Sequence, residues 1–179
     1  MGRIFFVCFI YLAMPKNQVD AALKDFSLWL RTNQWRGKEH DCVNMFAHKF
    51  LYNKITPDSA IYSLMQIRIE CGLKQPGNDK YLKKSARKDL VIWGEPEQNS
   101  WSETWEPVNI PIVVMEWKAK FKPAHKGMIN SHDTEWVRLY TEENPNCIGF
   151  VVLVDLTTDP RKIYWRSSKR GKLSKQICI

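Results

Sequence analysis

The chain has 179 residues, of which 44% are apolar, and lysine and arginine outnumber aspartate and glutamate by 27 to 19. This length fits one domain with a single core, and this composition indicates a folded globular chain rather than a disordered one. The resulting net charge of +8 attracts polyanions such as nucleic acid or an anionic membrane surface, but a positive field does not by itself specify any chemistry.

The five cysteines lie far apart and contain no Cys-x-x-Cys pair. Their spacing predicts neither a zinc ribbon nor a disulfide framework. Reduced thiols are typical of the cytoplasm, where we expect this protein to be located.

An apolar run at residues 4–14 follows Arg3 and is too short to span a bilayer. Three interpretations stay open: a buried strand or helix, an upstream extension with the true start at Met14, and an export signal. We therefore treat residues 1–14 as a separate apolar segment and residues 15–179 as a single domain that is not embedded in a membrane.

Apolar residues recur at helical spacing along the first half of the chain. This pattern predicts helices over residues 17–31 and 38–52. Extending the apolar stripe of the second helix back by one turn places Glu39 at its head. A third helix is predicted to begin at Thr56, which precedes a proline, and to end at Gly72.

Short runs rich in β-branched residues predict strands in the second half, with one further helix between them. The strands are expected over residues 89–93, 110–117, 148–156 and 162–166, and the helix over residues 131–143. The third strand is almost entirely apolar, as expected of a strand covered on both faces. This order of elements predicts an α/β fold, in which helices pack on a sheet after a helical N-terminal half.

Charged side chains occur near one end of two of these strands. Because side chains alternate between the two faces of a strand, Arg87, Asp89 and Val91 are predicted to share one face. Glu116 and Lys118 share a face of the next strand by the same rule. Charges at the end of a buried strand are costly unless they are paired or bind a metal. Two carboxylates suit Mg²⁺, with Mn²⁺ as a substitute, and the lysine can orient a metal-bound water or stabilise developing charge.

The segment Lys88-Asp89-Leu90-Val91-Ile92, followed by Val113-Val114-Met115-Glu116-Trp117-Lys118, resembles the core of the PD-(D/E)xK, or restriction-endonuclease-like, nuclease superfamily. The resemblance extends over the helix and the apolar strand that follow, from about residue 38 to 166. It implies a restriction-endonuclease-like mixed sheet flanked by helices, within a single nuclease-like domain over residues 15–179.

The resemblance also implies an activity. In that family, a strand aspartate and a following Glu-x-Lys strand hold magnesium and the attacking water, and a glutamate of the preceding helix often joins them. By this correspondence Asp89, Glu116 and Glu39 are expected to bind the metal, and these three with Lys118 are the expected catalytic residues. The implied function is a metal-dependent nuclease that hydrolyses phosphodiester bonds in DNA, with RNA not excluded.

Three features depart from the family pattern. Lys88 stands where the family has a proline, and the connection between Asp89 and Glu116 is long. Some relatives carry a glutamine one helical turn before a tyrosine on the later helix, whereas here Trp136 precedes Tyr140. No subfamily is therefore indicated.

Basic residues cluster before the aspartate strand and after the Glu-x-Lys strand, as expected of a groove that binds phosphates. The expected nucleic-acid-binding residues are Lys83, Lys84, Arg87, Lys88, Lys120 and Lys122. The alternative is a solvated basic face. A long loop over residues 94–109 carries glutamates, no basic residue and two tryptophans, and is interpreted either as a flap over the groove or as an oligomer contact.

Other interpretations of the acidic residues stay open. Asp89 and Glu116 could be strand-end charges paired with neighbouring lysines, and Glu39 could be a first-turn acid favoured by the helix dipole. At the level of function, the alternatives are an inactive nucleic-acid-binding module of the same fold and a protein-interaction domain. The oligomeric state, monomer or homodimer, is also open.

Overall fold

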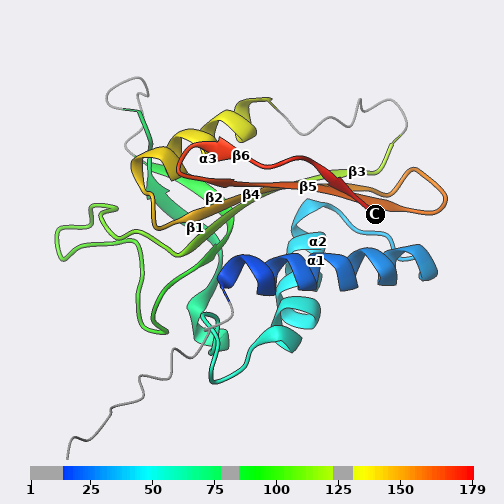
Figure 1. Cartoon of the computed structure of the whole chain (residues 1–179), viewed down its shortest axis with the longest axis horizontal. Helices are drawn as coiled ribbons and strands as arrows, with labels where there is room; N and C mark the ends of the chain where they lie inside the picture. Colours follow the sequence, from blue (N-terminus) through cyan, green and yellow to red (C-terminus); the bar gives the residue numbers. More distant parts are fainter. Residues whose placement is uncertain (1–13, 78–84, 123–130) are drawn as a thin grey trace, which may run out of the picture.

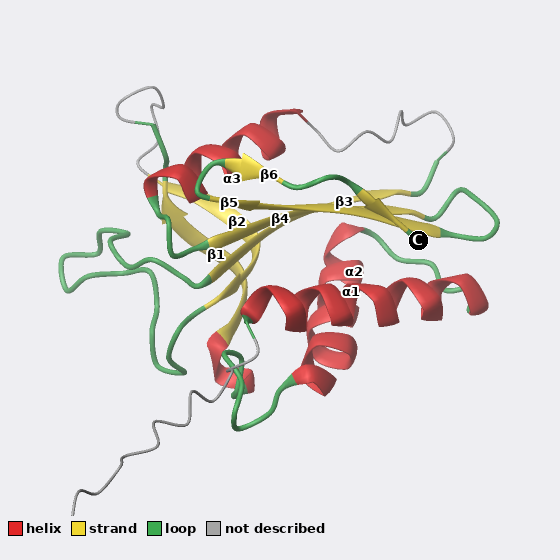
Figure 2. Ribbon diagram, in the orientation of Figure 1, coloured by secondary structure: helices red, strands yellow, loops and turns green. Residues whose placement is uncertain are grey.

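The computed structural model describes residues 14–77, 85–122 and 131–179. They form a mixed sheet with helices on both faces (Figures 1 and 2). The helical elements are α1 (Pro15–Thr32), α2 (Glu39–Met45), the π-helical η1 (Phe46–Leu51), the 3-10 turns η2 (Tyr52–Lys54) and η3 (Leu64–Gln66), and α3 (Ser131–Glu143). The strands are β1 (Ile67–Lys74), β2 (Ser85–Ile92), β3 (Val113–Lys120), β4 (Ile148–Asp155), β5 (Lys162–Lys169), β6 (Lys172–Leu173) and β7 (Ile177–Cys178).

The strands lie in the order β1-β2-β3-β4-β5-β6, and β7 pairs with β5. Strands β3 and β4 are parallel and are joined through α3, whereas the other neighbouring pairs are antiparallel. A parallel pair requires such a crossover connection, and α3 supplies it on one face of the sheet. Every residue of β4 is buried, because helices cover both of its faces.

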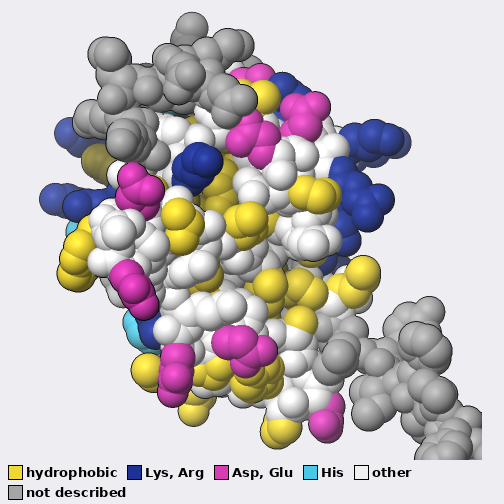
Figure 3. Space-filling view, turned by 90° about the vertical axis from the view of Figure 1, so that its left-hand side faces the viewer, with side chains coloured by type: hydrophobic (Ala, Val, Ile, Leu, Met, Phe, Trp, Pro, Cys, Tyr) yellow, Lys and Arg dark blue, Asp and Glu magenta, His cyan; other side chains and the backbone are white. Residues whose placement is uncertain are grey.

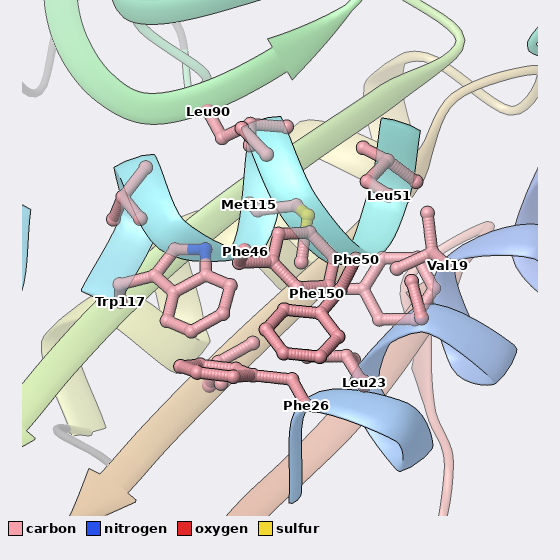
Figure 4. Packing of buried hydrophobic residues seen from close by; sticks show 14 of the residues in the cluster. Val19, Leu23, Phe26, Phe46, Phe50, Leu51, Leu90, Met115, Trp117 and Phe150 are labelled. Atoms are coloured by element: carbon pink, nitrogen blue, oxygen red, sulfur yellow. The ribbon is translucent and has the colours of Figure 1, made fainter. Parts of the chain in front are cut away.

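Helices α1 and α2 with η1 cover one face of the sheet (Figure 1). The apolar stripe of α1 buries Leu23 and Phe26 against this face. The ring of Trp117 lies 5.0 Å from that of Phe46 and 6.3 Å from that of Phe26, centroid to centroid (Figure 4). Each large apolar side chain buried in this way contributes roughly 1.5–3 kcal/mol to stability.

Helix α3 covers the opposite face through Trp136, Val137 and Tyr140. The helix comes so close to β4 that a Cβ added at Gly149 would lie 2.2 Å from Val137 Cγ1. Only glycine therefore fits at this position of the strand. The close approach holds α3 against β4 through Val137 and Thr141, and the first turn of the same helix carries Asp133.

Most of the predicted elements are present, and the coarse α/β prediction with a helical N-terminal half is confirmed. The predicted helices at residues 17–31 and 131–143 correspond to α1 and α3. The predicted helix at 38–52 is a composite of α2, η1 and η2. The four predicted strands are all present, with bounds that differ from the predicted ones by up to four residues, while residues 1–13 lie outside the described part of the chain.

The predicted helix from Thr56 to Gly72 is wrong. This segment contains turns and η3, and then strand β1, which pairs with β2 from Ile67 to Lys74. The buried side chain of Gln18 accepts from the Ile61 amide and donates to the Ile61 carbonyl oxygen. Tertiary hydrogen bonds thus hold an irregular connection where local spacing favoured a helix.

The alternation of side chains between the two faces of the sheet is broken at Glu70 in β1 and at Asp89 in β2. Ile69 and Leu90 pack with the α1 and α2 side of the core, whereas Cys71 and Ala86 pack with the α3 side. Glu70 and Asp89 fall between the register pairs Ile69–Leu90 and Cys71–Lys88, and Glu70 has a φ of 54°. The prediction that Arg87, Asp89 and Val91 share one face is therefore wrong, because the alternation of faces is broken at Asp89.

Within the described residues, no helix combines the length and the apolar character needed to cross a membrane.

Candidate functional site

The side chain of Asp89 lies where β2 and β3 cease to pair. The last pair of residues in this ladder is Leu90 with Met115. Beyond this pair, the amide of Trp117, two residues after Met115, donates to Oδ2 of Asp89, the residue before Leu90, at 2.6 Å. Where the two strands diverge, the Trp117 amide has no backbone acceptor on β2. The Asp89 carboxylate accepts its hydrogen bond instead.

Glu116 is buried beside Asp89, with 6% of its surface exposed. Its carboxylate forms an ion pair with Lys88, which is itself only 5% exposed. The Lys88 ammonium also lies 3.6 Å from the centroid of the Trp136 ring. Lys88 was expected on a basic approach to the site, but the exchange of faces in β2 turns it inward against α3.

Burial raises the pKa of the Glu116 carboxyl to about 7, although the Lys88 ammonium lowers it and Asp89 raises it further. Removing this carboxylate from water disfavours its charged form more than one lysine favours it. Glu116 is therefore an acid whose charge changes near neutral pH.

The ammonium of Lys118 is held by three oxygens. It donates to the Trp117 carbonyl oxygen at 2.7 Å and to Glu39 Oε1 at 3.3 Å, and it lies 3.7 Å from Asp133 Oδ2. Burial lowers the pKa of Lys118, but the carboxylates around it outweigh this effect and raise the pKa above its ordinary value. Lys118 thus remains a cation fixed in position, suited to stabilise negative charge rather than to accept a proton.

Glu39 joins the site from the opposite layer of the fold. It is the first residue of α2, and the Lys38 amide before it donates to Asp41 Oδ2 at 2.8 Å, which fixes the start of the helix. Burial raises the pKa of Glu39 even though Lys118 lowers it, and the negative charge of Asp89 raises it further. The structure therefore brings Glu39, Asp89, Glu116 and Lys118 together.

Asp133 belongs to the same site and was not among the residues chosen from the sequence. It lies in the first turn of α3 and its side chain is 14% exposed. Its Oδ2 atom is buried and has no hydrogen-bond partner within the described residues, since Lys118 is beyond hydrogen-bonding distance. The sequence feature that could have identified Asp133 is its place as the acidic residue in the first turn of the helix that follows the Glu-x-Lys strand.

The charges of this site do not cancel. It combines four carboxylates, those of Glu39, Asp89, Glu116 and Asp133, with the two ammonium groups of Lys88 and Lys118. When all six are ionised, two negative charges remain, which one divalent cation would neutralise. Carboxylate oxygens are the ligands that Mg²⁺ prefers, so the chemistry of the donors fits this ion.

The positions of the donors fit the ion less well. In the described part of the chain, no three histidine, cysteine, aspartate or glutamate side chains converge closely enough to hold a metal as they stand. Glu116 and Glu39 each contact a lysine ammonium. A cation that binds here would have to compete with Lys88 for Glu116.

The expected nucleic-acid-binding residues are dispersed. Arg87 is exposed and forms an ion pair with Glu70, and Lys120 is partly buried beside Asp155. Lys122 is exposed, whereas Lys83 and Lys84 lie outside the described residues. Among the described residues, Arg87 and Lys122 are thus the expected contacts that solvent can reach freely.

No family model, curated protein or solved structure matches this chain. The functional argument accordingly depends on the residues of the site and on their geometry.

Proposed function

We propose that this protein is a magnesium-dependent nuclease that hydrolyses phosphodiester bonds in DNA, on a restriction-endonuclease-like fold. The observation that carries the proposal is the meeting of Asp89, Glu116 and Lys118 where β2 and β3 diverge. When all six groups are ionised the site carries an excess of two negative charges, which supports binding of a divalent cation.

The topology around the site supports the same proposal. The strand that bears Asp89 is antiparallel to the strand that bears Glu116 and Lys118. Helix α3 and the parallel strand β4 follow in sequence. This is the order of strands and helix that the resemblance to the PD-(D/E)xK superfamily implies.

In this proposal the carboxylates hold the cation and Lys118 acts on the substrate side. Asp89, Glu116 and Glu39 supply the oxygen ligands, while Lys118 holds its ammonium ready to stabilise charge on a phosphate. Bound Mg²⁺, or Mn²⁺ in its place, would supply a water of lowered pKa and a polarised phosphate oxygen. The net charge of +8 favours encounter with a polyanion such as DNA.

A second candidate function is favoured by one observation. Lys88 already neutralises Glu116 in a buried ion pair. If this pair persists in the presence of magnesium, the chain is a nucleic-acid-binding module of the same fold without activity.

One experiment separates the two candidates. The purified protein is incubated with supercoiled plasmid, single-stranded DNA and RNA, each with Mg²⁺, with Mn²⁺ and with EDTA. We expect metal-dependent cleavage of DNA that Lys118→Ala abolishes and that Lys24→Ala, an exposed lysine of α1, leaves unchanged. Binding of DNA without cleavage under any of these conditions would favour the inactive module, and cleavage of RNA alone would change the substrate.

A further inference from the structure

The loop between β2 and β3 folds onto the edge strand β1. Gln66 Nε2 donates to the Gly94 carbonyl oxygen at 3.0 Å, and Arg68 Nη2 donates to the Pro96 carbonyl oxygen at 3.2 Å. The indole of Trp101 lies directly over Gly72, where an added Cβ would be 3.2 Å from Trp101 Cζ2. Figure 3 shows this face of the molecule, on which apolar side chains and carboxylates are interspersed.

Between this loop and the strands β1 and β2 lies a cavity of about 650 Å³. This volume falls within the range of small-molecule sites, roughly 300–1,000 Å³. The cavity is lined by both aromatic and polar groups, including Trp93, Trp101, Asn99 and Ser100. Trp93 is fully buried, and its Nε1 has no hydrogen-bond partner within the described residues.

The charges around the cavity favour an anion. Arg68 donates to carbonyl oxygens and forms no ion pair with a carboxylate in the described part of the chain. Arg87 is paired with Glu70, the one acidic residue of the lining. One positive charge is therefore left over, and guanidinium groups bind phosphate with directed hydrogen bonds.

The aromatic lining favours a flat ring. Trp101 is 38% exposed although its ring is fixed against β1. Stacking of a base on such an indole tolerates any base, because every base has a π face. A ligand that joins a planar ring to an anionic group fits both halves of the lining, and a nucleotide has this chemistry.

We propose that this cavity binds an unpaired nucleotide, with its base against Trp101 and its phosphate beside Arg68 and Arg87. The choice of a nucleotide over other anionic aromatic ligands rests on the proposed nuclease function. Glu70 and Asp89 are flanked by the same two β1–β2 pairs, and Arg87 precedes Asp89 by two residues. A strand with one phosphate at Asp89 thus places a neighbouring nucleotide at the rim of this cavity, and the protein prefers single-stranded or frayed DNA to blunt duplex.

The test is calorimetric titration of the full-length protein with deoxyadenosine and deoxycytidine monophosphate in EDTA. We expect saturable binding of both nucleotides, weakened at least tenfold by Trp101→Ala and by Arg87→Gln. The matched controls are Trp105→Ala, a tryptophan of the same loop that is 78% exposed and outside the cavity lining, and Lys24→Gln on α1. Both controls should bind like the wild type.

Several results would overturn the proposal. They are no saturable binding of either nucleotide, equal effects of Trp101→Ala and Trp105→Ala, and binding of inorganic phosphate as tight as that of the nucleotides. If Trp101→Ala unfolds the protein, Trp101→Phe, which keeps a ring, and Arg87→Gln at the exposed rim decide the question: the first should retain binding and the second should lose it.

The failure of this proposal differs from the failure of the nuclease proposal. Cleavage of DNA by a protein that binds no nucleotide in EDTA would refute nucleotide binding in the cavity and support the proposed nuclease site. If the protein never cleaves DNA but binds nucleotides in a way that depends on Trp101, the nuclease function is refuted and nucleotide binding in the cavity is supported. Asp89→Asn should abolish cleavage and keep nucleotide binding, because Asp89 is not part of the lining.

Discussion

Asp89 Oδ2 accepts a 2.6 Å hydrogen bond from the backbone amide of Trp117, the residue between Glu116 and Lys118. This one contact ties the aspartate of β2 to the Glu-x-Lys segment of β3 after the two strands have stopped pairing. The Asp89 carboxylate also lies close enough to Glu116 and Glu39 to raise the pKa of both, as expected of acids that share a proposed cation site. Asp89 therefore has both a structural and a proposed metal-binding role, and substitution can separate them.

The two roles predict different effects of two substitutions at Asp89. Asp89→Asn keeps an oxygen acceptor for the Trp117 amide, so the free energy of unfolding should change little while cleavage is lost and high magnesium partly restores it. Asp89→Ala leaves the amide without its partner and should cost about 1–3 kcal/mol of stability. Urea denaturation in EDTA measures both values. Equal stability of the two variants would show that the hydrogen bond to Trp117 contributes nothing.

Lys118→Ala should separate catalysis from binding. The Lys118 ammonium contacts Glu39 and Asp133 and is proposed to stabilise charge on the phosphate. Its loss should reduce the cleavage rate by about 10²–10³-fold, as for other electrostatic stabilisers, while DNA affinity falls only modestly. Single-turnover cleavage and filter binding measure the two quantities. Unimpaired cleavage by this variant would disprove the assigned site.

Lys88→Met tests whether Lys88 competes with a metal ion for the carboxylate of Glu116. The substitution keeps an apolar chain over Trp136 but leaves a buried carboxylate without its cation, at a cost on the order of 3–5 kcal/mol. Mg²⁺ should then raise the melting temperature of the variant more than that of the wild type, because the metal no longer displaces an ammonium.

The control for this prediction is Lys120→Met, which removes a lysine of the same strand as Glu116 that pairs with Asp155 and not with a carboxylate of the site. Magnesium should shift its melting temperature as it shifts that of the wild type. An identical magnesium response in Lys88→Met and the wild type would mean that no cation reaches Glu116.

The raised pKa of Glu116 predicts how stability depends on pH in the absence of metal. In the unfolded chain Glu116 loses its proton near its ordinary pKa of 4.5, whereas in the folded protein it keeps the proton up to about pH 7. The folded state thus binds more protons between these values, and its stability falls as pH rises through this window.

Glu116→Gln removes this titration. The wild type should lose stability relative to Glu116→Gln between about pH 4.5 and pH 7, by an amount on the order of 3 kcal/mol. Urea denaturation in EDTA at several pH values measures the difference. A difference between the two proteins that stays constant with pH would refute the raised pKa.

The sequence by itself determined the elements whose pattern is both long and regular. Apolar spacing placed α1 and α3, and the uninterrupted apolar run placed β4, because these segments bury one stripe or both faces whatever their neighbours are. It also indicated that Asp89, Glu116 and Lys118 belong to one region, since charges at the end of buried strands need partners.

Only the tertiary structure decided how those charges are partnered. The face exchange at Glu70 and Asp89 turns Lys88 onto Glu116 and Trp136, and no local pattern reports such a break. Asp133 enters the site because α3 packs closely over Gly149, a contact between distant parts of the chain. Strand β1 could not be predicted for the same reason. Its apolar spacing is that of a helix, but pairing with β2 makes it a strand. The energy of strand pairing depends on a partner that the local sequence does not contain.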